Sequence, residues 1–278
     1  MRSELWLTAV TASTFSSVEQ IVAAIAAVRE RPVLLLTDFD GTLCEFKDTP
    51  DAVMLSRPRR LALSALATRP TWSVGIVSGR RAADVRRRAA LSGSAYYAGL
   101  HGMEIDGPDK QFQVPGFGAL HDEIQCLGNA LGEATASFPG ALLENKDLSV
   151  ALHVRAASPR DRRHAERSFW TLAGPMIEAG TLRLQRGECV FELLPNIAWD
   201  KGDAVRWIEA DLRHRHGAAA FPIYLGDDRT DEHAFDAVGD RGLTVVVGSR
   251  PSRARYRLPD PSAIEQLLTR LAAPHAPH

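Results

Sequence analysis

The stretch VLLLTDFDGTLCEF, residues 33–46, joins an apolar run directly to two aspartates, Asp38 and Asp40. The run is continuous rather than alternating, which is typical of a central parallel strand covered on both faces. Gly41 then permits a sharp turn. Two like charges at the edge of a core repel each other and lose hydration. Their position at a strand end therefore indicates that they serve a function.

Helix and strand patterns alternate in the segments that follow this stretch. They predict a helix, a strand, a second helix and a short strand over 57–69, 71–80, 81–93 and 95–102. This alternation is typical of the α/β class with a doubly wound parallel sheet. We therefore expect a parallel sheet with helices on both faces.

The pattern changes from about residue 106 and returns after Trp199. Between these positions we predict an inserted α+β domain with short alternating strands and a helix, in the segments 104–116, 145–157, 181–195 and 161–180. Before the first strand, residues 17–30 have a helical pattern, with Ser17 and Gln20 spaced as a capping box. The predicted organisation is a helical lead-in, a core in two parts and an insert, at 1–30, 31–105 with 199–278, and 106–198.

Composition excludes several functional classes. The chain has 278 residues, 45% of them hydrophobic, and a net charge of −1 with dispersed Lys and Arg. This pattern argues against nucleic acid or an anionic membrane as a partner. Neither a membrane-length apolar run nor a signal-peptide pattern is present, so we expect a cytoplasmic protein. The cysteines Cys44, Cys126 and Cys189 lie far apart and predict neither a disulfide framework nor a zinc site.

Polar motifs occur at predicted strand ends and helix starts, along the edge of the sheet where open α/β folds bind ligands. They are DFDGT at 38–42, SGR at 78–80, DKG at 200–202 and GDDRTDE at 226–232. Each alone fits an ordinary turn, helix cap, surface lysine or acidic helix start. Their joint occurrence on one edge of one sheet favours a functional site there.

A calcium-binding loop is the other interpretation of the D-x-D pattern at Asp38. It would need glycine at its sixth position and glutamate at its twelfth. The chain has Leu43 and Thr49 there. The calcium interpretation therefore fails.

The four motifs resemble those of phosphatases of the haloacid dehalogenase superfamily. Within it, the segments 98–102, 144–155 and 191–205 (AGLHG, ENKDLSVALHVR and FELLPNIAWDKGDAV) resemble the trehalose-6-phosphate phosphatase family. The resemblance covers residues 33–270. It implies a Rossmann-like core with a smaller cap domain inserted between the second and third motifs.

The resemblance also implies roles for the core motif residues. Asp38 would be the nucleophile that becomes an aspartyl phosphate, and Asp40 the general acid and base. Thr42 and Ser78 would hydrogen-bond the phosphoryl group. Lys201 would neutralise both the phosphoryl group and the nucleophile.

Phosphoryl transfer requires positive charge, because a bare carboxylate attacking an anion is repelled. Mg²⁺ prefers carboxylate and carbonyl oxygens and water. The resemblance implies that Asp38, the backbone carbonyl of Asp40 and Asp227 would hold this ion. Asp228 and Asp231 would orient its waters and the motif lysine.

Substrate choice would lie with the cap. By resemblance, Lys146 and Glu192 of the cap would bind sugar hydroxyls, and Arg80 and His101 of the core would lie near the sugar. One position departs from the family, which commonly has lysine where this chain has Glu188. A basic sugar contact is then either absent or supplied by a neighbouring arginine.

The resemblance implies a Mg²⁺-dependent phosphomonoesterase that acts on trehalose 6-phosphate. One alternative is the same chemistry on a sucrose- or mannosyl-type phosphate. Another is a noncatalytic, sugar-phosphate-sensing partner of a synthase, which the intact Asp38, Asp40, Lys201 and Asp227 argue against. A signalling receiver domain would need neither the second acid nor the insert. A functional link to a trehalose-6-phosphate synthase remains open.

Overall fold

The computed structural model describes residues 14–28, 32–47, 52–146, 148–187 and 189–273. The chain forms two compact units. Unit 1 contains Met1–Gln113 and Trp199–His278, and unit 2 contains Val114–Ala198. We refer to unit 1 as the core and to unit 2 as the cap.

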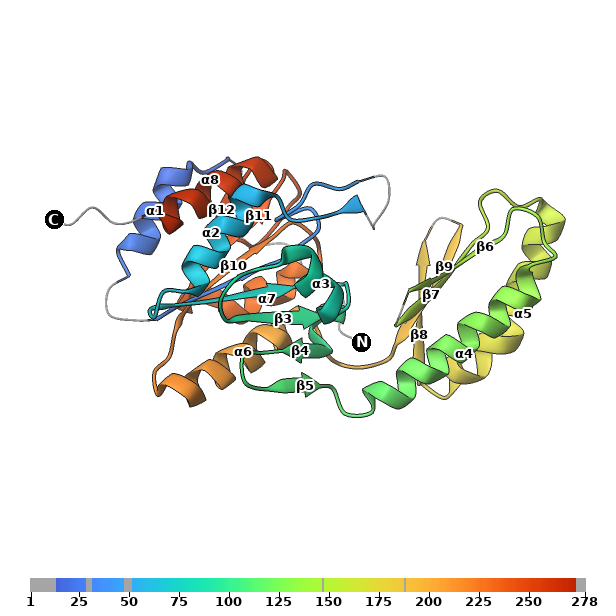
Figure 1. Ribbon diagram of the computed structural model, residues 1–278. Helices are drawn as coiled ribbons and strands as arrows, with labels where there is room; N and C mark the ends of the chain where they lie inside the picture. Colours follow the sequence, from blue (N-terminus) through green and yellow to red (C-terminus); the bar gives the residue numbers. More distant parts are fainter. Residues whose placement is uncertain (1–13, 29–31, 48–51, 147, 188, 274–278) are drawn as a thin grey trace. The chain divides into compact units, whose positions relative to one another are not determined.

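An eight-stranded sheet forms the centre of the core, in the order β12-β11-β10-β1-β2-β3-β4-β5 (Figure 1). The quoted stretch supplies β1 (Val33–Thr37), which pairs in parallel with β10 (Phe221–Gly226) and β2 (Trp72–Val77). Every residue of β1 is buried, as the continuous apolar pattern predicts. Strand order reverses at β1, and ligands bind where such a reversal occurs in open α/β sheets.

The remaining strands complete this sheet on both sides of the central three. They are β3 (Ala95–Gly99), β4 (Glu104–Asp106), β5 (Gln111–Gln113), β11 (Leu243–Val247) and β12 (Tyr256–Leu258). β3, β11 and β12 are parallel to their inner neighbours, whereas β4 and β5 are antiparallel. The predicted α/β fold with a doubly wound, mostly parallel sheet is confirmed.

Helices cover both faces of the sheet. Alternate residues of β1 point to opposite faces, so the strand contributes to one buried cluster on each side. Leu35 belongs to one buried cluster, and Leu34 and Leu36 to the other. The first cluster includes residues of α1 (Val18–Ala26), α2 (Arg57–Ala67), α3 (Ala82–Ala89) and α8 (Pro261–Ala272). The second includes residues of α6 (Lys201–His216) and α7 (Asp231–Val238). Figure 1 shows α1, α2 and α8 together on one side of the sheet and α6 on the other.

Two features of the core differ from the predicted organisation. β4 pairs with β3, placing Ile105 opposite Ala98, and β5 pairs with β4. The core therefore extends to Gln113 instead of ending at residue 105. The short alternating segment, which resembles the cap strands in pattern, forms an antiparallel edge of the parallel sheet.

The lead-in helix is the second feature. Ser17 and Gln20 form the expected capping box, with backbone-to-side-chain bonds of 2.9 and 3.1 Å. Ile21 and Ile25 of α1 are buried in the same cluster as β1, and the helix contacts α8. This helix is thus part of the core.

The cap is an α+β unit, as predicted for the insert. Its four antiparallel strands have the order β6-β7-β9-β8. They span Leu142–Lys146, Ser149–His153, Val190–Pro195 and Leu182–Gly187, in the same order. Its helices are α4 (Phe117–Thr135) and α5 (Pro159–Glu178) (Figure 1).

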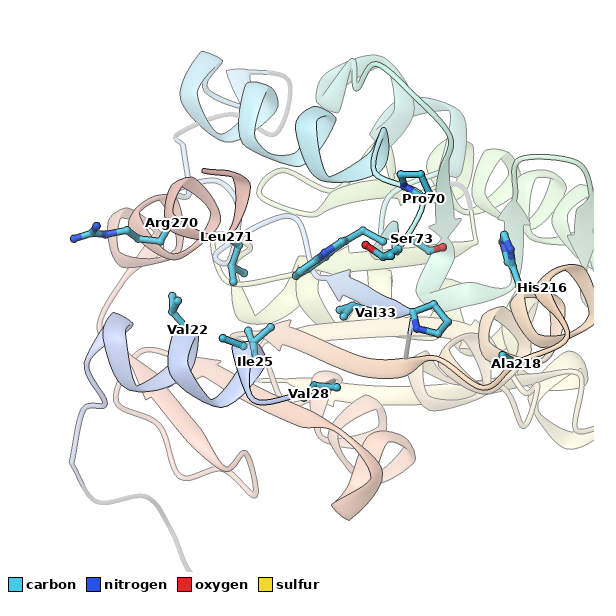
Figure 2. Close-up of a pocket in the computed structure, with 14 residues that line it drawn as sticks. Val22, Ile25, Val28, Val33, Pro70, Ser73, His216, Ala218, Arg270 and Leu271 are labelled. Carbon is cyan, nitrogen blue, oxygen red and sulfur yellow. The ribbon is translucent and has the colours of Figure 1, made fainter. Parts of the chain in front are cut away.

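A cavity of about 640 Å³ lies at the amino ends of the core strands (Figure 2). Its walls include Val33 at the start of β1, Val22 and Ile25 of α1, and Leu271 of α8. The motif residues follow the carboxyl ends of the strands, so the cavity lies at the opposite edge of the sheet. Among the described residues, no helix is both long enough and apolar enough to span a membrane.

Candidate active site

The first motif leaves β1 in a tight turn. Asp38 continues the parallel ladder, its backbone N–H donating to the carbonyl of Leu225 at 2.8 Å. Gly41 has φ of +83°, and a Cβ there would lie 2.2 Å from Oδ2 of Asp227. Glycine is therefore required at this position, both for the backbone conformation and for the close approach of Asp227.

Lys201 brings the first, third and fourth motifs together. It is the first residue of α6, whose N-terminus is capped by the side chain of Asp200. Its side chain is only 2% exposed, and Nζ donates to Oδ1 of Asp38 at 2.8 Å and to Oδ1 of Asp231 at 2.7 Å. Burial alone would lower the pKa of Lys201, but the two carboxylates outweigh it and raise this pKa. The lysine is therefore a fixed positive charge beside Asp38.

Asp231 is fully buried, and both its carboxylate oxygens accept hydrogen bonds. Besides Lys201, Oδ1 accepts from the hydroxyl of Tyr224 at 2.9 Å, and Oδ2 accepts from the backbone N–H of Asp228 at 2.9 Å. A Cβ at Gly226 would lie 2.4 Å from Cγ of Asp231. These contacts fix Asp231, so it holds the lysine in place. Asp228 contributes its backbone N–H to this network, and the predicted role of its carboxylate toward metal-bound water stays a prediction.

Tyr224 is a residue that the sequence did not single out. It lies fully buried in β10, and burial raises the pKa of its phenol well above the usual value. The hydroxyl therefore stays protonated and acts as a donor. A lone hydroxyl-bearing side chain in the otherwise apolar strand FPIYLG is the signal that could have indicated it.

Three carboxylates form a group that could hold a metal ion. Candidate oxygens of Asp38, Asp227 and Asp231 all lie within 4.8 Å of one another. Thr42, which was predicted to contact phosphate, donates from its hydroxyl to Oδ1 of Asp227 at 2.8 Å. Within the described part of the chain, Oδ2 of Asp38 and Oδ2 of Asp227 accept no hydrogen bond. Both oxygens can therefore accept a cation.

The charges of this group fit a divalent cation. Three carboxylates and the ammonium of Lys201 leave two negative charges uncompensated among these four side chains. Burial raises the pKa of Asp38 and of Asp227, and the neighbouring acidic residues raise both further. Hard oxygen donors of this kind suit a cation such as Mg²⁺ or Ca²⁺. The structure does not test the predicted use of the backbone carbonyl of Asp40.

The predicted general acid is held by an arginine. Arg80 forms two hydrogen bonds to Asp40, from Nε to Oδ2 and from Nη2 to Oδ1, both 2.7 Å long. Its Nη1 donates to Asp84 of α3 at 3.4 Å. The hydrogen bond to Asp40 is the main reason that the pKa of Arg80 is raised. Arg80, predicted to lie near the sugar, is thus a partner of Asp40 in this structure.

The segments after β2 and β3 are bound to each other. The backbone N–H of His101 donates to the carbonyl of Ser78 at 2.8 Å, and that of Leu100 to the carbonyl of Arg80 at 2.8 Å. His101 has φ of +59°, and a Cβ at Gly79 would come within 3.1 Å of its ring. Ser78 is buried, with Oγ accepting from the backbone N–H of Arg80 at 3.2 Å. These bonds therefore bring Ser78, Arg80 and His101 together at the carboxyl edge of the sheet.

The predicted substrate residues of the cap lie on its sheet. Glu192 is in β9 opposite Ala151, and its Oε1 accepts a hydrogen bond from Ser149 at 3.0 Å. Lys146 is the last residue of β6 and lies opposite Ser149. Glu188, where the chain departs from the family, lies outside the described residues. The roles of Lys146 and Glu192 stay predictions.

Comparison with known proteins adds to this geometry. The sequence profile of the family described as Trehalose-phosphatase matches residues 36–262. A trehalose-phosphate phosphatase of Mycobacterium marinum is 39% identical over 249 residues, which are 87% of this chain and 62% of that protein. The chain thus spans less than two thirds of that relative's length.

Solved structures share the fold. The C-terminal domain of the trehalose-6-phosphate phosphatase of C. albicans has a TM-score of 0.68 at 22% identity, over 94% of this chain and 98% of that domain. The C-terminal domain of a trehalose synthase regulatory protein of Candida albicans has a TM-score of 0.61 at 13% identity, over 94% of this chain and 100% of that chain. Because a regulatory protein also has this fold, catalysis must be argued from the residues of the site.

Proposed function

Because the chain belongs to the trehalose-phosphatase family, we propose that it hydrolyses trehalose 6-phosphate to trehalose and inorganic phosphate. The observation that carries this proposal is the contact of Lys201 with both Asp38 and Asp231, 2.8 and 2.7 Å long, beside an acid two residues after Asp38. A noncatalytic relative would be expected to lack at least one of these groups. The proposed enzyme is a phosphomonoesterase that uses an aspartyl-phosphate intermediate.

In the first half of the proposed reaction, a carboxylate oxygen of Asp38 attacks phosphorus. The new bond joins Asp38 to phosphorus, and the bond from phosphorus to the sugar oxygen breaks. Asp40 gives its proton to the leaving oxygen. In the second half, Asp40 takes a proton from the water that attacks phosphorus, and Asp38 is released as a carboxylate. The starting residues are restored, and the products are a sugar hydroxyl and inorganic phosphate.

The other core residues would supply charge and hydrogen bonds. Lys201 offsets the negative charge shared by the nucleophile and the phosphoryl group. The hydroxyls of Ser78 and Thr42 would donate to phosphoryl oxygens, Thr42 after leaving its present acceptor on Asp227. Arg80, now on Asp40, would have to release one of its bonds before it could contact a sugar.

We further propose Mg²⁺ as the cation of this site. Asp38 and Asp227 would hold it with the backbone carbonyl of Asp40, and Asp228 and Asp231 would help to orient its waters. When bound, Mg²⁺ offsets the repulsion between a carboxylate nucleophile and a phosphate dianion. Octahedral coordination by oxygen atoms is the usual arrangement for this ion.

The proposed role of Asp40 predicts a partial loss of activity in Asp40→Asn. Asp38 could still attack, but neither proton transfer would have its positioned group, so we expect kcat to fall by about 10²- to 10⁴-fold. The measurement is steady-state phosphate release, together with acid-quench detection of phosphorylated protein. The control is Asp240→Asn, at an exposed position of the core in the short turn Gly239–Arg241 that follows α7. Unchanged kcat in folded Asp40→Asn would exclude the proton-transfer role.

The substrate proposal predicts a split between two kinds of ester. Lys146→Ala and Glu192→Ala should lower kcat/KM for trehalose 6-phosphate about ten- to a hundredfold, since charged hydrogen bonds to hydroxyls contribute roughly 1.5–3 kcal/mol each. A small generic phosphate ester has no sugar for them to bind, so its hydrolysis should change little. The matched control is Glu166→Ala, which removes a carboxylate of the cap that binds Arg162 at 2.8 Å.

The same assay separates the competing substrates. Phosphate release from trehalose 6-phosphate should exceed that from sucrose- and mannosyl-type phosphates. If one of those phosphates is hydrolysed faster than trehalose 6-phosphate, that phosphate is the substrate and the trehalose 6-phosphate proposal is wrong. No release from any ester with Mg²⁺ present would favour the noncatalytic sensing role. Equal losses on sugar and generic esters in the folded cap variants would mean that Lys146 and Glu192 are structural.

A further inference from the structure

We infer that Arg250 is a positioning residue for the cation site: it clamps the loop that carries Asp227 and so sets the affinity for the divalent cation. The inference rests on the metal site proposed above. Arg250 belongs to none of the four motifs and lies between β11 and β12. Its loop reaches the neighbouring segment after β10, which contains Asp227 and Asp228.

One guanidinium holds several groups of this loop. Nε donates to the backbone carbonyl of Asp227 and Nη2 to that of Asp228, each at 2.5 Å. Nη1 lies 2.6 Å from Oε1 of Glu232 and also donates to the carbonyl of Pro251 at 2.8 Å. Two consecutive carbonyls are thereby fixed from outside the loop. Their fixed orientation limits rotation of the peptide planes on the C-terminal side of Asp227 and of Asp228.

The clamp complements the bonds already described. Thr42 holds one oxygen of the Asp227 side chain, and the backbone N–H of Asp228 is bound to Asp231. Among the described residues, Arg250 is the one donor seen on the carbonyl of Asp227, whereas the carbonyl of Asp228 also accepts from the backbone N–H of Asp231 at 3.2 Å. A carboxylate binds a metal ion more tightly when neighbouring groups hold it in the binding orientation before the ion arrives. Arg250 would help to hold Asp227 in that orientation by fixing its backbone carbonyl.

The charges also suit a positioning role. A bare guanidinium near the site would repel a cation. Glu232 compensates for it at 2.6 Å, and these two side chains are only 23% and 15% exposed. The planar fork of arginine provides several donors in fixed directions, whereas lysine provides a single compact charge. Lysine could keep the pair with Glu232 but could not hold both carbonyls in the same geometry.

The experiment measures metal affinity directly, without turnover. Mn²⁺ serves as the probe, with the unbound ion counted by electron paramagnetic resonance in the full chain without substrate. Arg250→Ala should raise the Mn²⁺ dissociation constant about ten- to a hundredfold, the usual effect of losing a residue that supports a metal ligand. Arg250→Lys should raise it too, because it keeps the charge but loses the fork. kcat at saturating Mg²⁺ should stay within about threefold of the wild-type value, since metal excess restores occupancy.

Arg253→Ala is the matched control, because this guanidinium lies in the same segment but binds Asp236. It should leave Mn²⁺ affinity unchanged. Unchanged affinity in folded Arg250→Ala or Arg250→Lys would overturn the inference, as would a loss of kcat that Mg²⁺ does not restore. A wild-type chain that binds no Mn²⁺ would overturn it together with the metal proposal. The substrate panel tests the proposed phosphatase function separately.

Discussion

Asp38→Asn should lose turnover on every phosphate ester, by about 10⁴-fold or more, because an amide oxygen cannot replace a carboxylate as the attacking nucleophile. The loss should be independent of the sugar, since the bond to phosphorus is common to all substrates. No phosphorylated protein should be trapped by acid quench. This separates Asp38→Asn from Asp40→Asn, in which the covalent intermediate can still form.

The substitution should leave the fold intact. Asparagine has nearly the shape of aspartate, so it fits the same buried position without a change in packing volume. Lys201 would still have Asp231 as a partner, 2.7 Å away. The thermal unfolding midpoint, compared with that of Asp240→Asn, measures this. Multiple turnover by purified, folded Asp38→Asn would rule out Asp38 as the nucleophile.

The sequence predicted the core well where one physical pattern dominates. β1 runs over Val33–Thr37, the apolar part of the quoted stretch, because a central parallel strand must be apolar on both faces. The capping box at Ser17 was readable for a similar reason: its two bonds join residues three apart in sequence. Such local signals do not depend on the tertiary arrangement.

The limit of the core was less readable. The hairpin of β4 and β5 has the short alternating pattern of a half-exposed strand, as do the cap strands. Whether such a strand pairs with Ala98 of the core or with a cap strand depends on long-range pairing. Local periodicity does not encode that choice. The predicted boundary at residue 105 therefore fell before the last core strands.

The site, like the core, has some features that the sequence predicts and others that depend on the tertiary arrangement. That the four motifs would lie at one edge followed from their predicted positions at strand ends and helix starts, because parallel strands bring their carboxyl ends to one edge. The family resemblance implied that Asp231 would orient Lys201. The individual bonds of the site did not follow from these positions. Arg80 binds Asp40 at 2.7 Å, and this contact depends on side-chain rotamers and on nearby charges. Arg250 could not be found from sequence, since a lone arginine in a loop has no characteristic spacing.

The two carboxylates of the first motif have different environments and different hydrogen-bond partners. Asp38 is 5% exposed and bound to Lys201, whereas Asp40 lies at the rim and is bound to Arg80. A buried nucleophile beside a fixed positive charge suits attack on an anion. An acid at the rim can reach both the leaving oxygen and water. The environments of these two aspartates thus agree with the proposed mechanism.

Removal of divalent cations should abolish activity to the background of the assay, and added Mg²⁺ should restore it. Three carboxylates, those of Asp38, Asp227 and Asp231, have candidate oxygens within 4.8 Å of one another. One ammonium group, that of Lys201, lies beside them. Without a cation, the remaining negative charge repels a phosphate dianion and keeps it away from Asp38. The measurement is phosphate release after exhaustive chelation and during titration with Mg²⁺, at constant ionic strength. Added Na⁺ at the same ionic strength is the control for screening.

Asp227→Ala sharpens this prediction, because it removes a proposed ligand without touching the nucleophile. We expect it to need at least about tenfold more Mg²⁺ for half-maximal activity, or to show no recovery. Zn²⁺ should restore little, since it favours His and Cys ligands in tetrahedral sites and this group offers carboxylates. Thr42→Val should have a smaller effect in the same direction, since its hydroxyl donates to Asp227 at 2.8 Å and orients that ligand. Full activity after exhaustive chelation would contradict the role of the metal, and wild-type Mg²⁺ dependence in Asp227→Ala would place the ion on other ligands.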